Sequence, residues 1–162
     1  MSGGEIESGA EGDVVYRWRL WRCWDSALPT VVFVMLNPST ADVIVNDPTV
    51  RRCLGFARMW GYGRLEVRNL FDLRATDPRA LAQHPTPNSQ HNDLAIQQIV
   101  QRADVVAAWG NHGEHRGRGL LVAREMLRPL AAHLWHLGLT KTGHPKHPLY
   151  LSNNSVRTEW TP

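Results

Sequence analysis

Short apolar runs that alternate with amphipathic segments are the feature of this 162-residue sequence that most restricts its fold. Residues 30–36 (TVVFVML) form a continuous β-branched and apolar run, which is typical of a strand buried on both faces. Residues 65–70, 104–109 and 133–139 each predict a further strand of this kind. Strands buried on both faces need helices above and below their sheet, so the pattern predicts an α/β domain.

The segments between these runs have helical spacing. Residues 47–60 begin with Asp-Pro, which predicts a helix capped by Asp47. Residues 91–103 and 118–128 predict two more helices, the second ended by Pro129. Strands that alternate with helices predict a mainly parallel sheet, because right-handed crossovers place the helices on its two faces.

The N-terminal part of the chain differs from this pattern. Residues 1–13 are rich in Gly, Ser and Glu, so we expect a flexible tail followed by a single domain over residues 14–162. Residues 16–24 alternate aromatic and basic side chains, which predicts an N-terminal edge strand. The tail lacks the basic start and apolar core of a secretory signal, and we expect a cytoplasmic protein.

Composition narrows the functional classes. No run approaches the roughly 18 apolar residues that a membrane span requires, so no membrane partner is expected. Two cysteines are too few for a disulfide framework or a Cys-ligated metal site, and we expect no cofactor. The net charge of +3 comes mainly from arginine, which suits contacts with phosphates and bases. A DNA or nucleotide partner is therefore compatible with the composition, which leaves the oligomeric state open.

Polar residues follow each of the four predicted sheet strands. Asn37 ends the first, Asn69 the second, Asn111 and His112 the third, and a polar loop from Thr140 the fourth. In open α/β sheets, ligands bind outside the carboxyl ends of the strands. We therefore expect four loops to converge on one crevice.

Each of these signals has a structural alternative. Asn37 before a proline is also typical of an Asx-turn or a helix cap. The loop over residues 143–151 holds His144 and His147 between prolines, a setting that fixes imidazoles, forms a structural turn, or, together with His112, binds a metal. The sequence has neither of the standard Gly-rich phosphate loops and no G-x-S-x-G nucleophile elbow.

Read in order, three short motifs resemble those of the uracil-DNA glycosylase superfamily. Leu36-Asn37-Pro38-Ser39 is similar to the Asn-Pro-Gly motif, with Ser39 in place of the usual glycine. The segment over residues 67–74 is similar to the stretch whose asparagine reads the uracil edge, and residues 147–151 are similar to the final His-Pro motif. His144-Pro145 is a rival placement of that last motif. The iron–sulfur cysteines of some superfamily members are absent.

The resemblance implies a fold and a set of roles. The fold is a uracil-DNA-glycosylase-like, three-layer αβα sandwich with a short, mainly parallel central sheet and the added edge strand. Asn37 would position the water and His147 or His144 would stabilise the departing base. The base would be bound by the following residues: Asn69, with Pro38 and Ser39 close by and Phe71, Tyr62 or Trp109 stacking on it.

From Tyr16 to about Trp160 the sequence also resembles an uncharacterised bacterial and phage family, domain of unknown function 1643. The leading hypothesis is a DNA base-excising hydrolase that acts on a deaminated or modified base. The alternatives are a nucleotide- or nucleic-acid-binding module without catalysis, favoured because an amide at Asn37 cannot take a proton, and a base-modification enzyme. The expected phosphate-binding residues around the pocket mouth are Arg51, Arg52, Arg58, Arg68, Arg74 and Lys146.

Overall fold

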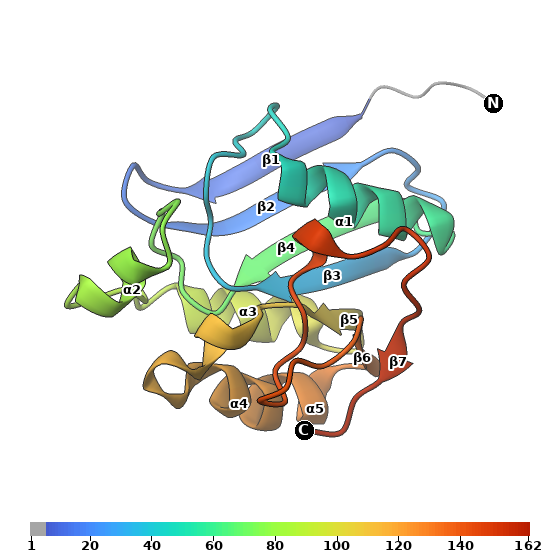
Figure 1. The fold of residues 1–162 in the computed structure, drawn as a ribbon. Coiled ribbons are helices and arrows are strands. Elements are labelled where there is room, and N and C mark those ends of the chain that lie inside the picture. The colour runs from blue at the N-terminus through green and yellow to red at the C-terminus, as the bar shows by residue number, and fades with distance from the viewer. Residues whose placement is uncertain (1–5) are drawn as a thin grey trace.

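The computed structural model describes residues 6–162, and its strands form one seven-stranded sheet (Figure 1). The strands are β1 (Glu7–Gly12), β2 (Arg17–Cys23), β3 (Thr30–Met35), β4 (Arg64–Asn69), β5 (Asp104–Ala107), β6 (His133–His136) and β7 (Thr158–Glu159). The helices are α1 (Pro48–Met59), α2 (Arg79–Gln83), α3 (Asn92–Val100), α4 (Arg118–Val122) and α5 (Arg128–Leu130). Two 3₁₀ helices, η1 (Asn111–Gly117) and η3 (Pro148–Tyr150), and the π-helical η2 (Ala123–Leu127) complete the fold.

The four apolar runs form β3 to β6, the parallel centre of a sheet that is mixed as a whole. The order across the sheet is β1-β2-β4-β3-β5-β6-β7. The pairs β3–β4, β3–β5 and β5–β6 are parallel, whereas β1–β2, β2–β4 and β6–β7 are antiparallel. The expectation of a mainly parallel sheet is therefore wrong. The helical crossovers set only the central strands parallel, while a short turn joins β1 to β2 as a hairpin.

β1 corrects the expected tail. Residues 7–12 pair with β2, and Gly9 lies opposite Trp21. A Cβ atom on Gly9 would lie 1.9 Å from the Trp21 ring, so only glycine lets that ring cover the strand. Aromatic cover of an edge glycine compensates for its low strand propensity, which is why composition pointed to a tail instead. Residues 1–5 of the expected tail lie outside the described residues.

Helices cover both faces of the sheet, as expected for an α/β fold. Successive strand residues point to opposite faces, so Phe33 and Met35 pack with α1, and Val32 and Val34 pack with α3 and α4. Figure 1 shows α1 over one face, with the red η3 turn beside it. The loop that follows β3 and the loop that follows β4 both lie next to the first turn of α1.

Local sequence signals predicted one helix end correctly and another incorrectly. Asp47 caps α1 as predicted: its side chain accepts the N–H of Val50 at 2.8 Å, and Pro48 is the first helical residue. The helix predicted to stop before Pro129 instead continues through η2 and α5 to Leu130. A wider π-helical turn immediately before the proline accommodates its missing N–H.

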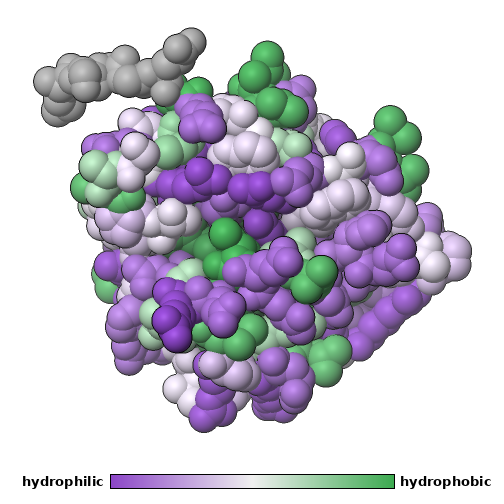
Figure 2. Space-filling model, turned by 180° about the vertical axis from the view of Figure 1, so that it is seen from behind, coloured by the Kyte–Doolittle hydropathy of each residue, from purple (hydrophilic) through white to green (hydrophobic). Residues whose placement is uncertain are grey.

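Within residues 6–162, no helix is both long and apolar enough to cross a membrane. Figure 2 shows the face opposite to that of Figure 1, where hydrophilic side chains predominate and hydrophobic groups form small, separated patches.

Candidate functional site

A cavity of about 650 Å³ opens at the carboxyl ends of β3, β4 and β5. The loops after these three strands and the segment around η3 form its walls. The loop that begins at Thr140 after β6, expected as the fourth, does not line the cavity until His147. Its lining consists of residues 35–39 and 109–112 together with Arg17, Leu20, Asp47, Thr49, Val50, Val67, Asn69, Ala75, Thr76, Pro78, His147, Leu149 and Tyr150. The structure thus brings Asn37, Asn69 and His147 to one cavity.

Asn37 uses one half of its amide to hold the cavity wall. The Nδ2 group donates to the carbonyl oxygen of Ala75 at 2.7 Å, and more weakly to those of Pro38 and Leu73 at 3.0 and 3.5 Å. The Oδ1 atom has no hydrogen-bond partner within residues 6–162. Asn37 therefore offers the cavity an acceptor, while its donor fixes the loop that follows β4.

Asn69 is buried yet has no partner for its side chain. The residue is 4% exposed, and its amide forms no hydrogen bond within residues 6–162. Its polar atoms are not fully enclosed by protein, unlike the unpaired Oδ1 of Asn92, and so remain accessible from the cavity. Strand alternation places Asn69 on the same face as Val67, which also lines the cavity. A buried amide normally finds partners, so an unpaired one facing a cavity indicates that a ligand or water completes it. It offers one acceptor and two donors.

His147, and not His144, lines the cavity. The Nδ1 atom of His147 accepts the backbone N–H of Leu149 at 3.3 Å and caps η3. Burial lowers the pKa of His147, partly offset by the charge of Asp47, so the ring is neutral near pH 7. With Nδ1 occupied as an acceptor, the proton lies on Nε2, which has no protein partner among the described residues. His144 is also buried but does not line the cavity.

Asp47 brings a carboxylate to the same cavity. Its Oδ1 atom caps α1, and its Oδ2 atom accepts the N–H of Ala41 at 3.3 Å. It is the only acidic residue in the cavity lining. The N-terminus of α1 therefore contributes both a fixed negative charge and, through Thr49, a hydroxyl to the wall.

The three aromatic residues expected to stack on the base lie in different parts of the molecule. Trp109 lines the cavity, but its ring packs beneath Gly113 and against Trp160, so it forms a wall instead of an open stacking surface. Phe71 lies outside the cavity, in the core covered by α3 and α4. Tyr62 lies at the opposite end of the sheet, where its hydroxyl donates to Asp104 at 2.6 Å. Tyr62 precedes β4 in the chain and therefore lies at the amino end of the parallel strands, away from the cavity.

None of the six basic residues expected at the pocket mouth lines the cavity. Arg68 forms a buried ion pair with Glu66 at 2.9 Å, and Arg58 lies over the ring of Trp24 at the other end of α1. The rest have separate places: Arg51 donates to the carbonyl of Asn46, Arg52 contacts Pro148 and Asn153, Lys146 lies beside Gly138, and Arg74 is half-buried near Arg17. The six residues therefore do not gather in the cavity lining, and their binding of phosphate stays a prediction.

Sequence reasoning missed several cavity residues. Tyr150 is 92% exposed at the rim, which is unusual for an aromatic side chain. From the sequence, Asp47 was interpreted only as a helix cap, although the helix that it starts, α1, is the first element after β3. Arg17 had no sequence signal as a site residue. Pro38 and Ser39, which were expected near the ligand, do line the cavity.

No group of three or more His, Cys, Asp or Glu side chains within residues 6–162 is arranged to hold a metal ion. His112, His144 and His147, weighed as metal ligands from the sequence, do not form such a group. The donors that the cavity presents are amide, imidazole, hydroxyl and carboxylate groups without that geometry.

Comparison with known protein families assigns the chain to one of them. The model of a family described as a protein of unknown function (DUF1643) matches residues 17–149, most of the chain and nearly all of the cavity lining. The chain belongs to the DUF1643 family. The match starts one residue after the expected Tyr16 and ends before Trp160. A search of curated proteins and a search of solved structures each return no match.

Proposed function

We propose that this DUF1643 protein binds a deaminated or modified base of DNA in the cavity and hydrolyses its N-glycosidic bond. The observation that carries the proposal is the buried, unpaired amide of Asn69 in the same cavity as His147. A planar base edge carries the alternating donors and acceptors that such an amide can pair with. The exposed ring of Tyr150 at the rim offers a surface on which a base can stack.

The chemistry needs three roles, and the cavity has a group for each. The oxygen of a water molecule bonds to C1′, and the electron pair of the N-glycosidic bond goes to the base. The Nε2–H group of His147 stabilises the negative charge that develops there. Asn37 Oδ1 accepts a hydrogen bond from the water and orients it. Asp47 takes the water's proton, which finally passes to the released base.

A second candidate is a module that binds the nucleotide without hydrolysis. It is favoured by the state of Asn37, whose amide cannot take a proton and whose Nδ2 group is engaged with Ala75. The missing cluster of basic residues around the mouth favours a small or single-stranded ligand over an extended duplex in either case.

The test is incubation with single-stranded and duplex oligonucleotides that carry uracil, hypoxanthine, xanthine or hydroxymethyluracil. Free base and abasic sites are measured, with the His147→Ala variant as the control for contaminating activity. Release of one base by the unmodified protein alone supports hydrolysis. Binding of the same oligonucleotides without release supports the module, and neither release nor binding contradicts both.

A further inference from the structure

Arg17 is a buried cation in the cavity wall that no carboxylate neutralises. Its exposed fraction is 4%, and the one hydrogen bond of its side chain within residues 6–162 goes from Nη1 to the carbonyl oxygen of Ala41. It forms no ion pair with any described carboxylate. Burial, with repulsion from Arg74, lowers the pKa of Arg17 to about 10, and the charges of Asp47 and Asp42 offset only part of this effect. Arg17 is therefore still charged at neutral pH.

The other buried arginines show what is unusual here. Arg68 pairs with Glu66 at 2.9 Å, and Arg118 pairs with Asp93. Arg22 donates to the side chain of Asn46 and to three backbone carbonyls. Burying a charge without such partners is costly, so proteins rarely do it unless something else completes the site. Arg68 also lines a cavity, on the other face of the sheet, but there its charge is paired with Glu66, whereas Arg17 lines its cavity without an ion pair to any carboxylate within residues 6–162.

A β-bulge aims Arg17 into the cavity. Between β1 and β2, Glu11 pairs with Arg19 and Gly12 pairs with Arg17, which leaves Trp18 as one extra residue. The extra residue restores Arg17 to the face of Leu20, and both line the cavity. Trp18 turns to the other face, where its ring packs on His91 at 4.9 Å. Bulges commonly re-aim a side chain next to a functional site.

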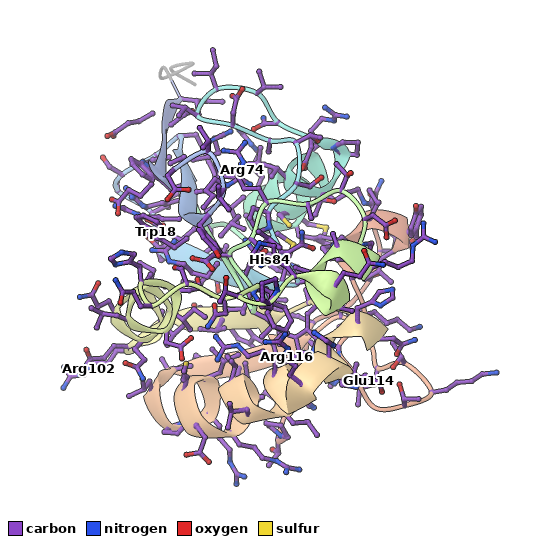
Figure 3. The ribbon with its side chains drawn as sticks, turned by 90° about the vertical axis from the view of Figure 1, so that its left-hand side faces the viewer. Trp18, Arg74, His84, Arg102, Glu114 and Arg116 are labelled. Atoms are coloured by element: carbon purple, nitrogen blue, oxygen red, sulfur yellow. The ribbon has the colours of Figure 1, made fainter. Side chains whose placement is uncertain are left out.

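The surroundings of Arg17 suit an anion. Thr49, in the first turn of α1, lines the same cavity, and the N-terminus of a helix favours negative charge. Figure 3 places Arg74 between the β1–β2 hairpin and α1, on the side of the molecule where β3 and β4 end. The Asp47 carboxylate is also near and raises the pKa of Arg17, but it forms no ion pair with the guanidinium and leaves its N–H groups free for a ligand.

We infer that Arg17, supported by Arg74 and Thr49, is a phosphate subsite, so that the cavity binds a nucleotide in preference to a free base or a nucleoside. This inference rests on the proposed function, because it assigns the base of the same nucleotide to Asn69 and His147. An arginine fork matches phosphate geometry, and one nucleotide carries the phosphate and the base together.

Titration calorimetry tests the subsite with four kinds of probe: inorganic phosphate, the nucleosides 2′-deoxyuridine and 2′-deoxyinosine, their 5′-monophosphates, and a trinucleotide with the matching central base. The monophosphate should bind at least about tenfold more tightly than its nucleoside, since a charged hydrogen-bond pair is lost with the phosphate. Arg17→Gln should remove that difference and leave nucleoside binding unchanged. A trinucleotide that binds more tightly than the monophosphate identifies a strand phosphate as the natural source.

Control variants separate the outcomes. Arg17→Lys retains the charge without the fork and should keep part of the preference, even if Arg17→Gln fails to fold. Arg74→Gln should weaken the preference, and Arg124→Gln, the same change on an exposed helix face, should not alter it. Equal affinity of the unmodified protein for nucleoside and monophosphate overturns the subsite but not the proposed function. Arg17-dependent binding of inorganic phosphate without any base recognition overturns the proposed function but not the subsite.

Discussion

The Nδ1 atom of His147 accepts the backbone N–H of Leu149 at 3.3 Å, and this bond fixes the proton of the neutral ring on Nε2. His147 therefore presents a donor to the cavity without being charged. A neutral donor can stabilise a departing base anion, as the proposed hydrolysis requires.

His147→Ala should lower turnover by about 10²–10³, the usual cost of removing one group that stabilises developing negative charge. Single-turnover release of base measures this directly. The matched control is His144→Ala, which removes a buried histidine of the same loop that does not line the cavity. Loss of activity in His144→Ala with no effect in His147→Ala would show that the motif histidine is misplaced by three residues.

Asn37→Ala should affect stability more than chemistry. It removes the Nδ2 bonds to the carbonyls of Pro38 and Ala75 and should lower the free energy of unfolding by about 1–3 kcal/mol. Its effect on turnover should be smaller than that of His147→Ala, because an amide orients the water but takes no proton. Urea denaturation and single-turnover assays of the two variants provide the comparison. A larger kinetic loss in Asn37→Ala would reverse the assignment of roles.

Asn69→Ala should relax base preference and leave stability nearly unchanged, by less than about 1 kcal/mol, since its side chain has no protein partner. The matched control is the buried Asn92, whose Nδ2 group donates to the carbonyls of Asn69 and Leu70 and to Asn88. Asn92→Ala should cost about 1–3 kcal/mol of stability and leave base preference intact. Thermal unfolding and binding assays across different bases separate the two. If Asn69→Ala destabilises as much as Asn92→Ala, its amide has a structural role.

The central fold could be predicted from the sequence because its signals are local. The continuous run at 30–36 allows only a strand buried on both faces, and the Asp-Pro at residue 47 starts a helix by capping geometry. β1 could not be predicted, because it depends on the ring of Trp21 covering Gly9 across the hairpin. The mixed character of the sheet follows from the same non-local pairing.

The residues of the candidate site also divide into those that local sequence signals predict and those that depend on non-local pairing. Asn37, Asn69 and His147 were predictable because each follows or faces a strand end, and the carboxyl ends of parallel strands share one edge. Arg17 was not, because only the bulge at Trp18 decides which face it takes. Arg68 was expected on the surface, but it is buried in an ion pair with Glu66, whose carboxylate also pairs with Arg19 and Arg64. Composition identifies a basic residue without identifying its partner.

Stability should fall as pH falls from about 7 to 5. Burial lowers the pKa of His147 below its ordinary 6.5, so the unfolded chain binds a proton that the folded protein resists. This contribution is full above 6.5 and is lost as pH falls through that value toward the folded pKa. His147→Gln should show a shallower decline in urea denaturation, with half-buried His136, whose pKa is also lowered, giving part of the remainder. An identical decline in His147→Gln would mean that His147 titrates normally.

Asp47→Asn separates two roles of one side chain. Asparagine caps helices about as well as aspartate, so the bond to the N–H of Val50 can persist and α1 should lose only about 0.3–1 kcal/mol from the helix dipole. The amide cannot take the proton of the attacking water, and turnover should fall by about 10²–10⁴.

The control for Asp47→Asn is Asp42→Asn, an exposed aspartate of the same loop that accepts the N–H groups of Ile44 and Val45 and does not line the cavity. It should retain full activity. The pH–rate profile adds a readout that a structural role would not affect, because loss of a general base removes the acidic limb of the profile. If Asp47→Asn keeps both its turnover and that limb, Asp47 only caps α1, and the water's proton must leave directly to solvent.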